Sequence, residues 1–323
     1  MSPRVLLLTD PAMLRHAAPG HPERPERMAA VEAGLVAGAA RAGAELDRRR
    51  PEPASAEAVA RVHDPAFVAE LDRLAGGGGG WLDPDTYLTS SSMPAARLAA
   101  GATLEAGRAA ASGEASVAFA VVRPPGHHAS AARACGFCLL NNVAVAVEEL
   151  RAALGLSRIA IVDWDVHHGD GTQEIYDPDP DVCYTSTHGW PLYPGTGARD
   201  ETGTGPAAGT KHNRPLPPGS GDEQFVAAWR DDLLPAVEAF GAEAILVSAG
   251  YDAHRDDPLA HLAVTERGYR SVAVLLGELA ARLRLPGVAL TLEGGYDLGA
   301  LEGSAAATVE GLLTGLAARA GGS

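Results

Sequence analysis

The chain has 323 residues, of which 46% are hydrophobic and 21% charged, a composition typical of a soluble globular protein. No stretch reaches the roughly 20 apolar residues that a membrane-spanning helix needs, so a membrane protein is excluded. The formal net charge of −15 repels polyanions, and nucleic acid is therefore not expected as a direct ligand.

The length allows one large α/β domain, and we expect a single domain over residues 1–323. Near the N-terminus, the apolar run from Val5 to Leu8 is too short for the core of a secretory signal. The three cysteines are an odd and sparse set that suits a reducing compartment better than a disulfide framework. Two of them stand in CGFC at 135–138, outside any thioredoxin-like context, which favours packing over redox chemistry. A cytoplasmic location is expected.

The first 115 residues contain helix-period apolar positions, in particular at 24–46 and 56–75. The glycine run from Gly76 to Gly80 predicts a flexible surface loop, a candidate for a mobile element near an entrance. We therefore interpret this N-terminal part as helices that cover a core.

From residue 115 onward, short apolar runs alternate with polar loops and longer helical patterns. Four of the runs are interpreted as strands, at residues 116–122, 158–164, 243–250 and 287–295. Near-continuous Val, Ile and Leu in strands that alternate with helices indicates a parallel sheet covered on both faces. The predicted fold class is α/β.

Ionisable side chains follow each of these four strands. The loops read RPPGHH (123–128), DWDVHHGDG (163–171), YDAHRDD (251–257) and EGGYD (293–297). In open parallel sheets, ligands bind beyond the carboxyl ends of the strands, where such loops converge. The four loops are therefore expected to form one site.

Asp165 and His167 lie two residues apart at the end of a strand, on the same face as Asp163, and can reach one metal ion. Asp252, at the neighbouring rim, is the best-placed third ligand. Two carboxylates and one imidazole leave coordination positions open for water and substrate, as catalytic rather than structural zinc sites do.

The adjacent His127 and His128 suggest a proton shuttle beside that metal, because imidazole titrates near neutral pH and a carboxylate can tune it. Asp163 and Asp170 are the acids available for that task. Tyr296 follows EGG, and opposite the metal its phenol would donate a hydrogen bond to an oxyanion.

Six ordered motifs carry a resemblance to a known family: RPPGHH, CGFCLLNNVAVA, VDWDVHHGDGTQEIY, YPGTG, VSAGYDAHRDDPLA and LEGGYDL, with GHPERPERM near the start. From about residue 20 to 300 the chain resembles zinc-dependent histone deacetylases, especially the class II branch and bacterial relatives such as histone deacetylase-like amidohydrolases and acetylpolyamine amidohydrolases. The resemblance implies an arginase/deacetylase-like fold, a three-layer sandwich around a largely parallel eight-stranded sheet.

The same resemblance implies a role for each motif residue. One Zn²⁺ per chain, with Fe²⁺ as the alternative, would be bound by Asp165, His167 and Asp252. Catalytic roles would fall to His127, His128, Tyr296, Asp163 and Asp170, the two aspartates each holding one histidine. A structural K⁺ below the zinc would involve, partly through backbone carbonyls, Asp163, Asp165, His167, Ser186 and Thr187.

The resemblance also implies a narrow tunnel for an acyl-lysine-like chain, with substrate contacts from Gly136, Phe137, Tyr193 and Leu259. Many family members have phenylalanine where Tyr193 stands. Leu259 stands where the polyamine-specific eukaryotic branch has an acidic gate. The absence of an acid there favours a lysine-type or general amide substrate.

The expected reaction is hydrolysis of an N-acyl amide, above all an acetyl amide, to a carboxylate and a free amine. Acetylated lysine peptides, acetylated polyamines and other small amides stay open as substrates, and no membrane partner is expected. A binuclear manganese ureohydrolase and a non-enzymatic acyl-ligand sensor stay as alternatives. The first is prompted by DVHHGD but is short of aligned carboxylates at 251–257.

Overall fold

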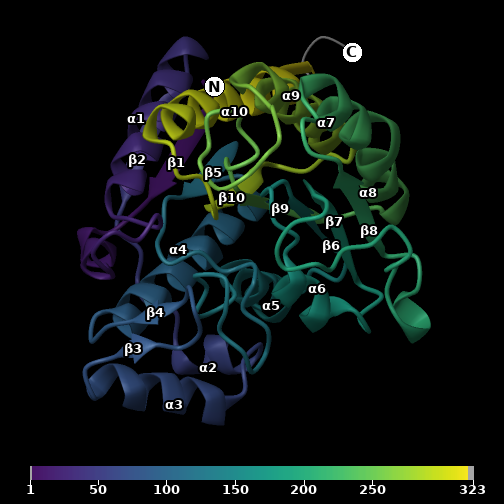
Figure 1. Ribbon diagram of the computed structural model, residues 1–323. Coiled ribbons are helices and arrows are strands. Elements are labelled where there is room, and N and C mark those ends of the chain that lie inside the picture. The colour runs from purple at the N-terminus through teal and green to yellow at the C-terminus, as the bar shows by residue number, and fades with distance from the viewer. Residues whose placement is uncertain (1, 319–323) are drawn as a thin grey trace.

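The computed structural model describes residues 2–318. Its centre is an eight-stranded sheet in the order β2-β1-β5-β10-β9-β6-β7-β8, in which all neighbours run parallel. Helices cover both faces, so the architecture is a three-layer α/β/α sandwich (Figure 1). The predicted α/β class and the parallel eight-stranded sheet are confirmed.

The strands β5, β6, β7, β9 and β10 are buried along their whole length, as a parallel sheet covered on both faces requires. The bounds in the main sheet are Arg4–Leu8 (β1), Glu45–Arg49 (β2), Val117–Ala120 (β5), Ile159–Asp163 (β6), Val182–Gly189 (β7), Lys211–Leu216 (β8), Ala244–Ala249 (β9) and Val288–Leu292 (β10). A separate ribbon pairs Gly80–Trp81 (β3) with Tyr87–Leu88 (β4).

The helices form two layers, one on each face of the sheet (Figure 1). One layer contains α1 (Glu26–Arg41), α7 (Asp222–Ala228), α8 (Leu234–Phe240), α9 (Glu266–Arg282) and α10 (Leu298–Ala317). The other contains α2 (Ala56–Ala60), α3 (Pro65–Gly76), α4 (Ser92–Ser112), α5 (Asn142–Leu154) and α6 (Asp170–Tyr176). Short 3₁₀ turns span Pro11–Arg15 and Gly205–Ala207, and a π-helical turn spans Trp229–Leu233. Within residues 2–318, no helix is both long enough and apolar enough to cross a membrane.

Small residues let α10 pack tightly between α1 and α9. A Cβ atom added to Gly38 of α1 would stand 2.5 Å from a carbonyl oxygen of α10, and one added to Gly277 of α9 would also stand 2.5 Å from such an oxygen. At the start of α10, the Asp297 side chain accepts a hydrogen bond from Ala300 N at 2.8 Å. The loop that ends at Tyr296 is therefore anchored on its carboxyl side.

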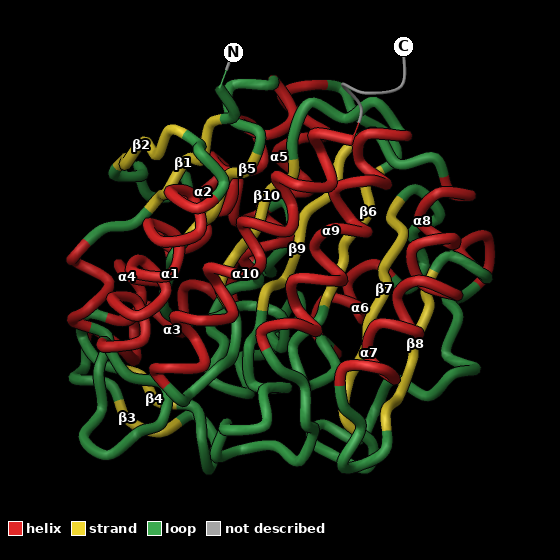
Figure 2. The backbone as a smooth tube through the Cα atoms, turned by 90° about the horizontal axis from the view of Figure 1, so that it is seen from above, coloured by secondary structure: helices red, strands yellow, loops and turns green. Residues whose placement is uncertain are grey.

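The four predicted strands are present as β5, β6, β9 and β10, and they are consecutive in the middle of the sheet. Figure 2 shows these strands side by side, with a large collection of loops at one end of the sheet. The loops that follow the four strands thus start from neighbouring positions.

The expectation of a purely helical covering layer at the N-terminus is incomplete. The structure places α1 and α3 in the predicted ranges, but β1 and β2 add two strands to the main sheet. β2 has the sequence ELDRR and is the edge strand of the main sheet, paired with β1, so it lacks the apolar run of an inner strand. The glycine run is not one loop, since Gly76 ends α3 and Gly80 begins β3.

Candidate metal centre and active site

The end of β6 and the loop after β9 bring together Asp165, His167 and Asp252. His167 Nδ1 lies 3.1 Å from Asp165 Oδ1 and 3.2 Å from Asp252 Oδ2. One ligand atom from each of the three residues lies within 4.8 Å of the others. The cluster forms because β6 and β9 are adjacent parallel strands, whose carboxyl ends lie side by side.

These three side chains fit a divalent cation. Asp165 and Asp252 are fully buried, and within residues 2–318 no arginine or lysine pairs with either. Buried carboxylates need compensating positive charge. Although burial opposes it, Asp165 and Asp252 raise the pKa of His167 to about 10. The two carboxylates therefore favour positive charge between them, and Asp252 Oδ2 accepts no hydrogen bond from the described part of the chain.

Glycines leave the space in front of these carboxylates open. A Cβ atom added to Gly250 would stand 2.0 Å from Asp165 Oδ2, and one added to Gly294 would stand 2.0 Å from Asp252 Oδ2. Backbone amides hold other oxygens, because Val166 N donates to Asp252 Oδ1 at 2.9 Å and Gly294 N donates to Asp165 Oδ2 at 2.7 Å. The backbone thus fixes how the carboxylates face one another.

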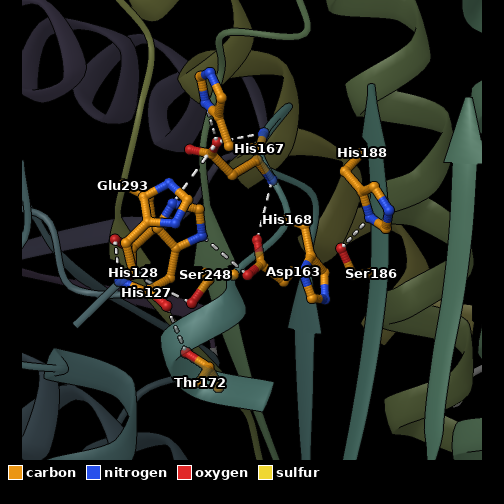
Figure 3. Close-up of polar contacts among 12 residues, drawn as sticks. His127, His128, Asp163, His167, His168, Thr172, Ser186, His188, Ser248 and Glu293 are labelled. Carbon is orange, nitrogen blue, oxygen red and sulfur yellow. Dashed lines mark hydrogen bonds and ion pairs between the residues drawn. The ribbon is translucent and has the colours of Figure 1, made fainter. Parts of the chain in front are cut away.

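His127 and His128 lie beside this cluster, with ring centroids 4.0 Å apart (Figure 3). His127 Nδ1 is 3.1 Å from Asp163 Oδ2, and His128 Nδ1 is 2.7 Å from Asp170 Oδ1. Although burial opposes it, Asp163 and Asp165 raise the pKa of His127. Burial and the neighbouring His127 lower the pKa of His128 to about 3. The two imidazoles therefore differ in basicity, and His127 is the more basic one.

Glu293 holds the histidine loop from the end of β10, a contact that the sequence analysis missed. Its Oε2 accepts hydrogen bonds from Gly126 N at 2.7 Å and His127 N at 3.2 Å. Ser248 Oγ of β9 donates to Oε1 at 3.2 Å (Figure 3). The sequence did contain a signal for this role, because Glu293 is an acid at the end of a buried strand, the first residue of EGGYD.

Tyr296 lies against Arg27 of α1, whose guanidinium carbon is 5.0 Å from the centre of the phenol ring. Arg27 Nε donates to Gly295 O at 2.5 Å, and its Nη2 donates to Glu293 O. Burial, together with Asp252, raises the pKa of Tyr296, so the phenol keeps its proton and can donate it in a hydrogen bond. Arg27 carries no signal of this contact in the sequence.

A buried ionic cluster supports Arg27 in turn. Glu23 Oε1 accepts from Arg27 Nη1 at 2.9 Å and from Arg123 Nε at 2.5 Å, and Glu23 Oε2 accepts from Arg123 Nη2 at 2.6 Å. All three side chains are 0% exposed. The cluster ties α1 to the loop after β5, which carries the histidine pair.

A cavity of about 240 Å³ gives access to these groups. His127, His128, His167 and Tyr296 line it. So do all four residues predicted to contact the substrate, which are Gly136, Phe137, Tyr193 and Leu259. Its wall is completed by Asp85, Pro125, Leu192 and Gly294. A larger hollow of about 800 Å³ shares Tyr193 but is lined by none of the three clustered ligand residues, so the smaller cavity, which His167 lines, is the candidate active site.

A tight turn brings Phe137 to this cavity. Gly136 and Phe137 have φ of 56° and 68°, as at the centre of a type I′ turn. The backbones of Cys135 and Cys138 form an isolated antiparallel β-bridge across this turn. The cysteines are free and buried, and Cys135 Sγ donates to His128 O at 3.2 Å. A left-handed conformation is uncommon for a residue with a side chain, and here it accompanies the placement of Phe137 in the cavity wall.

Ser186 and Thr187, which are predicted for a potassium site, belong to β7. In the parallel pairing of β6 with β7, Ser186 lies opposite Asp163. Ser186 Oγ is 2.9 Å from His188 Nδ1 (Figure 3), and Trp229 Nε1 donates to Thr187 Oγ1 at 3.2 Å. Each hydroxyl group thus has one hydrogen-bond partner among the described residues. The potassium site stays a prediction.

Comparison with known proteins finds similarity along nearly the whole chain. Residues 21–312 match the family model described as the histone deacetylase domain. A probable deacetylase of Archaeoglobus fulgidus is 42% identical over 308 residues, which are 94% of this chain and 84% of that protein. A histone deacetylase-like amidohydrolase of Pseudomonas aeruginosa is 37% identical over 283 residues, 87% of this chain and 74% of that protein. The crystal structure of the HDA15 HD domain matches with a TM-score of 0.89 at 36% identity, over 97% of this chain and 90% of that one.

Proposed function

Because this chain belongs to the histone deacetylase family, we propose that it hydrolyses the acetyl amide of a lysine-like or amine substrate in a zinc-dependent reaction. The family confirms the predicted arginase/deacetylase-like fold and a hydrolase that acts on amides. One observation carries the finer proposal: a cluster of metal-ligand side chains, a histidine pair and Tyr296 meet around one cavity.

Asp165, His167 and Asp252 would hold the zinc, with Fe²⁺ as the alternative metal. Their two carboxylates and one imidazole leave coordination positions for the substrate. Bound there, zinc would supply a Lewis acid that polarises the amide carbonyl and makes water more acidic. A structural K⁺ is part of the proposal, held partly by backbone carbonyls at Asp163, Asp165, His167, Ser186 and Thr187.

His128 would act as the general base. Its Nδ1 is paired with Asp170, which leaves Nε2 to accept a proton from the attacking water. His127, paired with Asp163, would take part in protonating the departing amine. Tyr296 would donate a hydrogen bond to the amide oxygen as that oxygen gains negative charge.

The cavity supports a slender amide substrate. Phe137, Tyr193 and Leu259 line it together with Gly136, and Leu259 is 36% exposed at its opening. An uncharged Leu259 offers nothing to a second ammonium group, which favours acetyl-lysine or a neutral amide over an acetylated polyamine. The three cysteines are free thiols, which supports the proposed cytoplasmic location.

The test is a substrate screen on the full chain loaded with zinc. Fluorogenic acetyl-lysine peptides, acetylated polyamines and simple acetyl amides are compared, with a hydroxamate as inhibitor and Asp252→Ala as the metal-deficient control. We expect hydrolysis of the acetyl-lysine peptide, inhibition by the hydroxamate, and about one zinc per chain in the wild type. A zinc-loaded protein that binds these compounds but hydrolyses none would instead be an acyl-ligand sensor.

A binuclear manganese ureohydrolase gains no support from the loop after β9. The side chain of Asp256 is 61% exposed, and Asp257 accepts the backbone N–H groups of Leu259 and Tyr296 with its two oxygens. Metal analysis that finds two manganese ions per chain would be needed to favour this alternative.

A further inference from the structure

Asp257 is a buried acid that has no part in the proposed mechanism, and it connects two walls of the cavity. It is 6% exposed. Its Oδ2 accepts a hydrogen bond from Tyr296 N at 2.7 Å, and its Oδ1 accepts one from Leu259 N at 2.9 Å. Within residues 2–318 no basic side chain lies at ion-pair distance from it. Both oxygens thus serve backbone amides.

These two amides belong to cavity residues from different segments. Leu259 stands in the loop after β9, and Tyr296 stands in the loop between β10 and α10. Gly294 and Gly295 precede Tyr296, and the φ of Gly295 is 112°, a conformation that glycine adopts freely. The backbone before the phenol therefore depends on outside contacts for a fixed position.

The contacts described above hold the backbone of the 293–297 loop at positions other than the N–H of Tyr296. Arg27 holds the carbonyl oxygens of Glu293 and Gly295, and Asp297 caps α10 after the loop. The N–H of Tyr296 itself is held by Asp257. At 2.7 Å in a buried position, this hydrogen bond restrains where the backbone of Tyr296 lies.

We propose that Asp257 is a positioning residue for Tyr296, which sets where the phenol meets the amide oxygen of the substrate. This inference rests on the proposed role of Tyr296 in amide hydrolysis. Asp257 does not line the cavity and is not part of the three-residue ligand cluster, so it acts through Tyr296 rather than on the substrate. A small displacement of a catalytic group lowers the rate of the chemical step more than it weakens the binding of the substrate.

The test compares Asp257→Asn, Tyr296→Phe and the double variant. Asparagine has the same shape but replaces one acceptor oxygen with an NH₂ donor, so one of the two amides loses its partner. We expect kcat of Asp257→Asn to fall roughly 10- to 100-fold, with KM within about threefold of wild type. In the Tyr296→Phe background the same change should cost less than about threefold, because the group that it positions is absent.

Asp256→Asn is the matched control, since Asp256 is the exposed neighbour and undergoes the same chemical change. Its kcat should equal that of the wild type. Zinc content and urea unfolding of each variant separate a local effect from loss of the fold. If Asp257→Asn does not fold, Asp257→Glu, which keeps both carboxylate oxygens, is taken through the same comparison.

An unchanged kcat in Asp257→Asn, or an equal loss with and without the Tyr296 hydroxyl, overturns the positioning role while the proposed function stands. A wild-type protein that hydrolyses no acetyl amide, or a Tyr296→Phe variant with unchanged kinetics, overturns the catalytic role of Tyr296 and this inference with it. The two failures are therefore distinguishable.

Discussion

Gly294 lies directly against Asp252, so that a Cβ atom added to the glycine would stand 2.0 Å from Asp252 Oδ2 and 2.6 Å from Asp165 Oδ2. Real Cβ atoms do not approach other atoms so closely. The absence of a side chain at this position therefore keeps open the space in which the two carboxylates face His167.

Replacing Gly294 by alanine should weaken zinc binding by about 10- to 100-fold, because the new methyl group pushes the carboxylates out of place. Competition with a fluorescent chelator, on metal-free protein, measures the affinity. Gly76→Ala is the control, since a Cβ there meets no atom within 4 Å. Equal affinity of Gly294→Ala and wild type would show that the ion does not lie between Asp165 and Asp252.

Replacing Tyr296 by phenylalanine should reduce kcat by on the order of 10²-fold, the usual loss when one donor to a developing oxyanion is removed. Steady-state kinetics on the best acetyl amide measure it. Tyr269→Phe also removes a buried hydroxyl, but one without a hydrogen-bond partner among the described residues and outside the cavity. That control should keep kcat, and a loss equal to that of Tyr296→Phe would contradict a specific role.

Replacing Glu23 by glutamine should lower the free energy of unfolding by about 3 to 5 kcal/mol, because Arg27 and Arg123 would be left buried without a full counter-charge. Urea denaturation measures this difference. Glu57→Gln is the matched control, since Glu57 and Arg61 form the same i,i+4 pair at the surface, with Glu57 82% exposed. We expect at most about 1 kcal/mol there.

Glu23 also predicts a dependence of stability on pH. Although burial would raise it, Arg123 and Arg27 lower the pKa of Glu23 from 4.5 to about 2. As the pH falls, the Glu23 carboxylate therefore takes up a proton in the unfolded chain before it does so in the folded chain. The contribution of ionised Glu23 to the free energy of unfolding is thus complete above about pH 4.5 and is lost as the pH falls toward 2. Its size is about 3.5 kcal/mol, at about 1.4 kcal/mol for each unit of pKa shift.

Urea unfolding of wild type and Glu23→Gln across this pH range tests the assignment. The stability difference between the two proteins should shrink as the pH falls from about 5 to about 2.5. A constant difference would assign the acid sensitivity to other groups.

The metal-ligand cluster could be predicted from the sequence because its residues stand at the ends of buried strands. The run before Asp165 and His167 reads as an inner strand, and parallel strands bring their carboxyl ends to one edge. Phe137 is different, because it reaches the cavity through a turn with positive φ, which no periodicity indicates. Its predicted contact followed from family resemblance alone.

The ionic cluster beneath Tyr296 could not be predicted. Arg27 stands in an amphipathic helical pattern, where an arginine is typical of the solvent-facing side, yet it is 0% exposed. Arg123, the third member, stands 100 residues from Glu23 in the chain, so no local pattern joins it to the other two. The same holds for β2, whose charged sequence resembles a surface segment until β1 provides a partner.

The four strands that carry the site loops are consecutive inside the sheet, whereas β2 and β8 form its two margins. One strand separates each margin from the nearest of these four strands, so a change within β2 or β8 is expected to leave the metal-ligand cluster in place. The interior of the sheet thus carries the metal-ligand cluster, and its edges are where a change in sequence disturbs that cluster least.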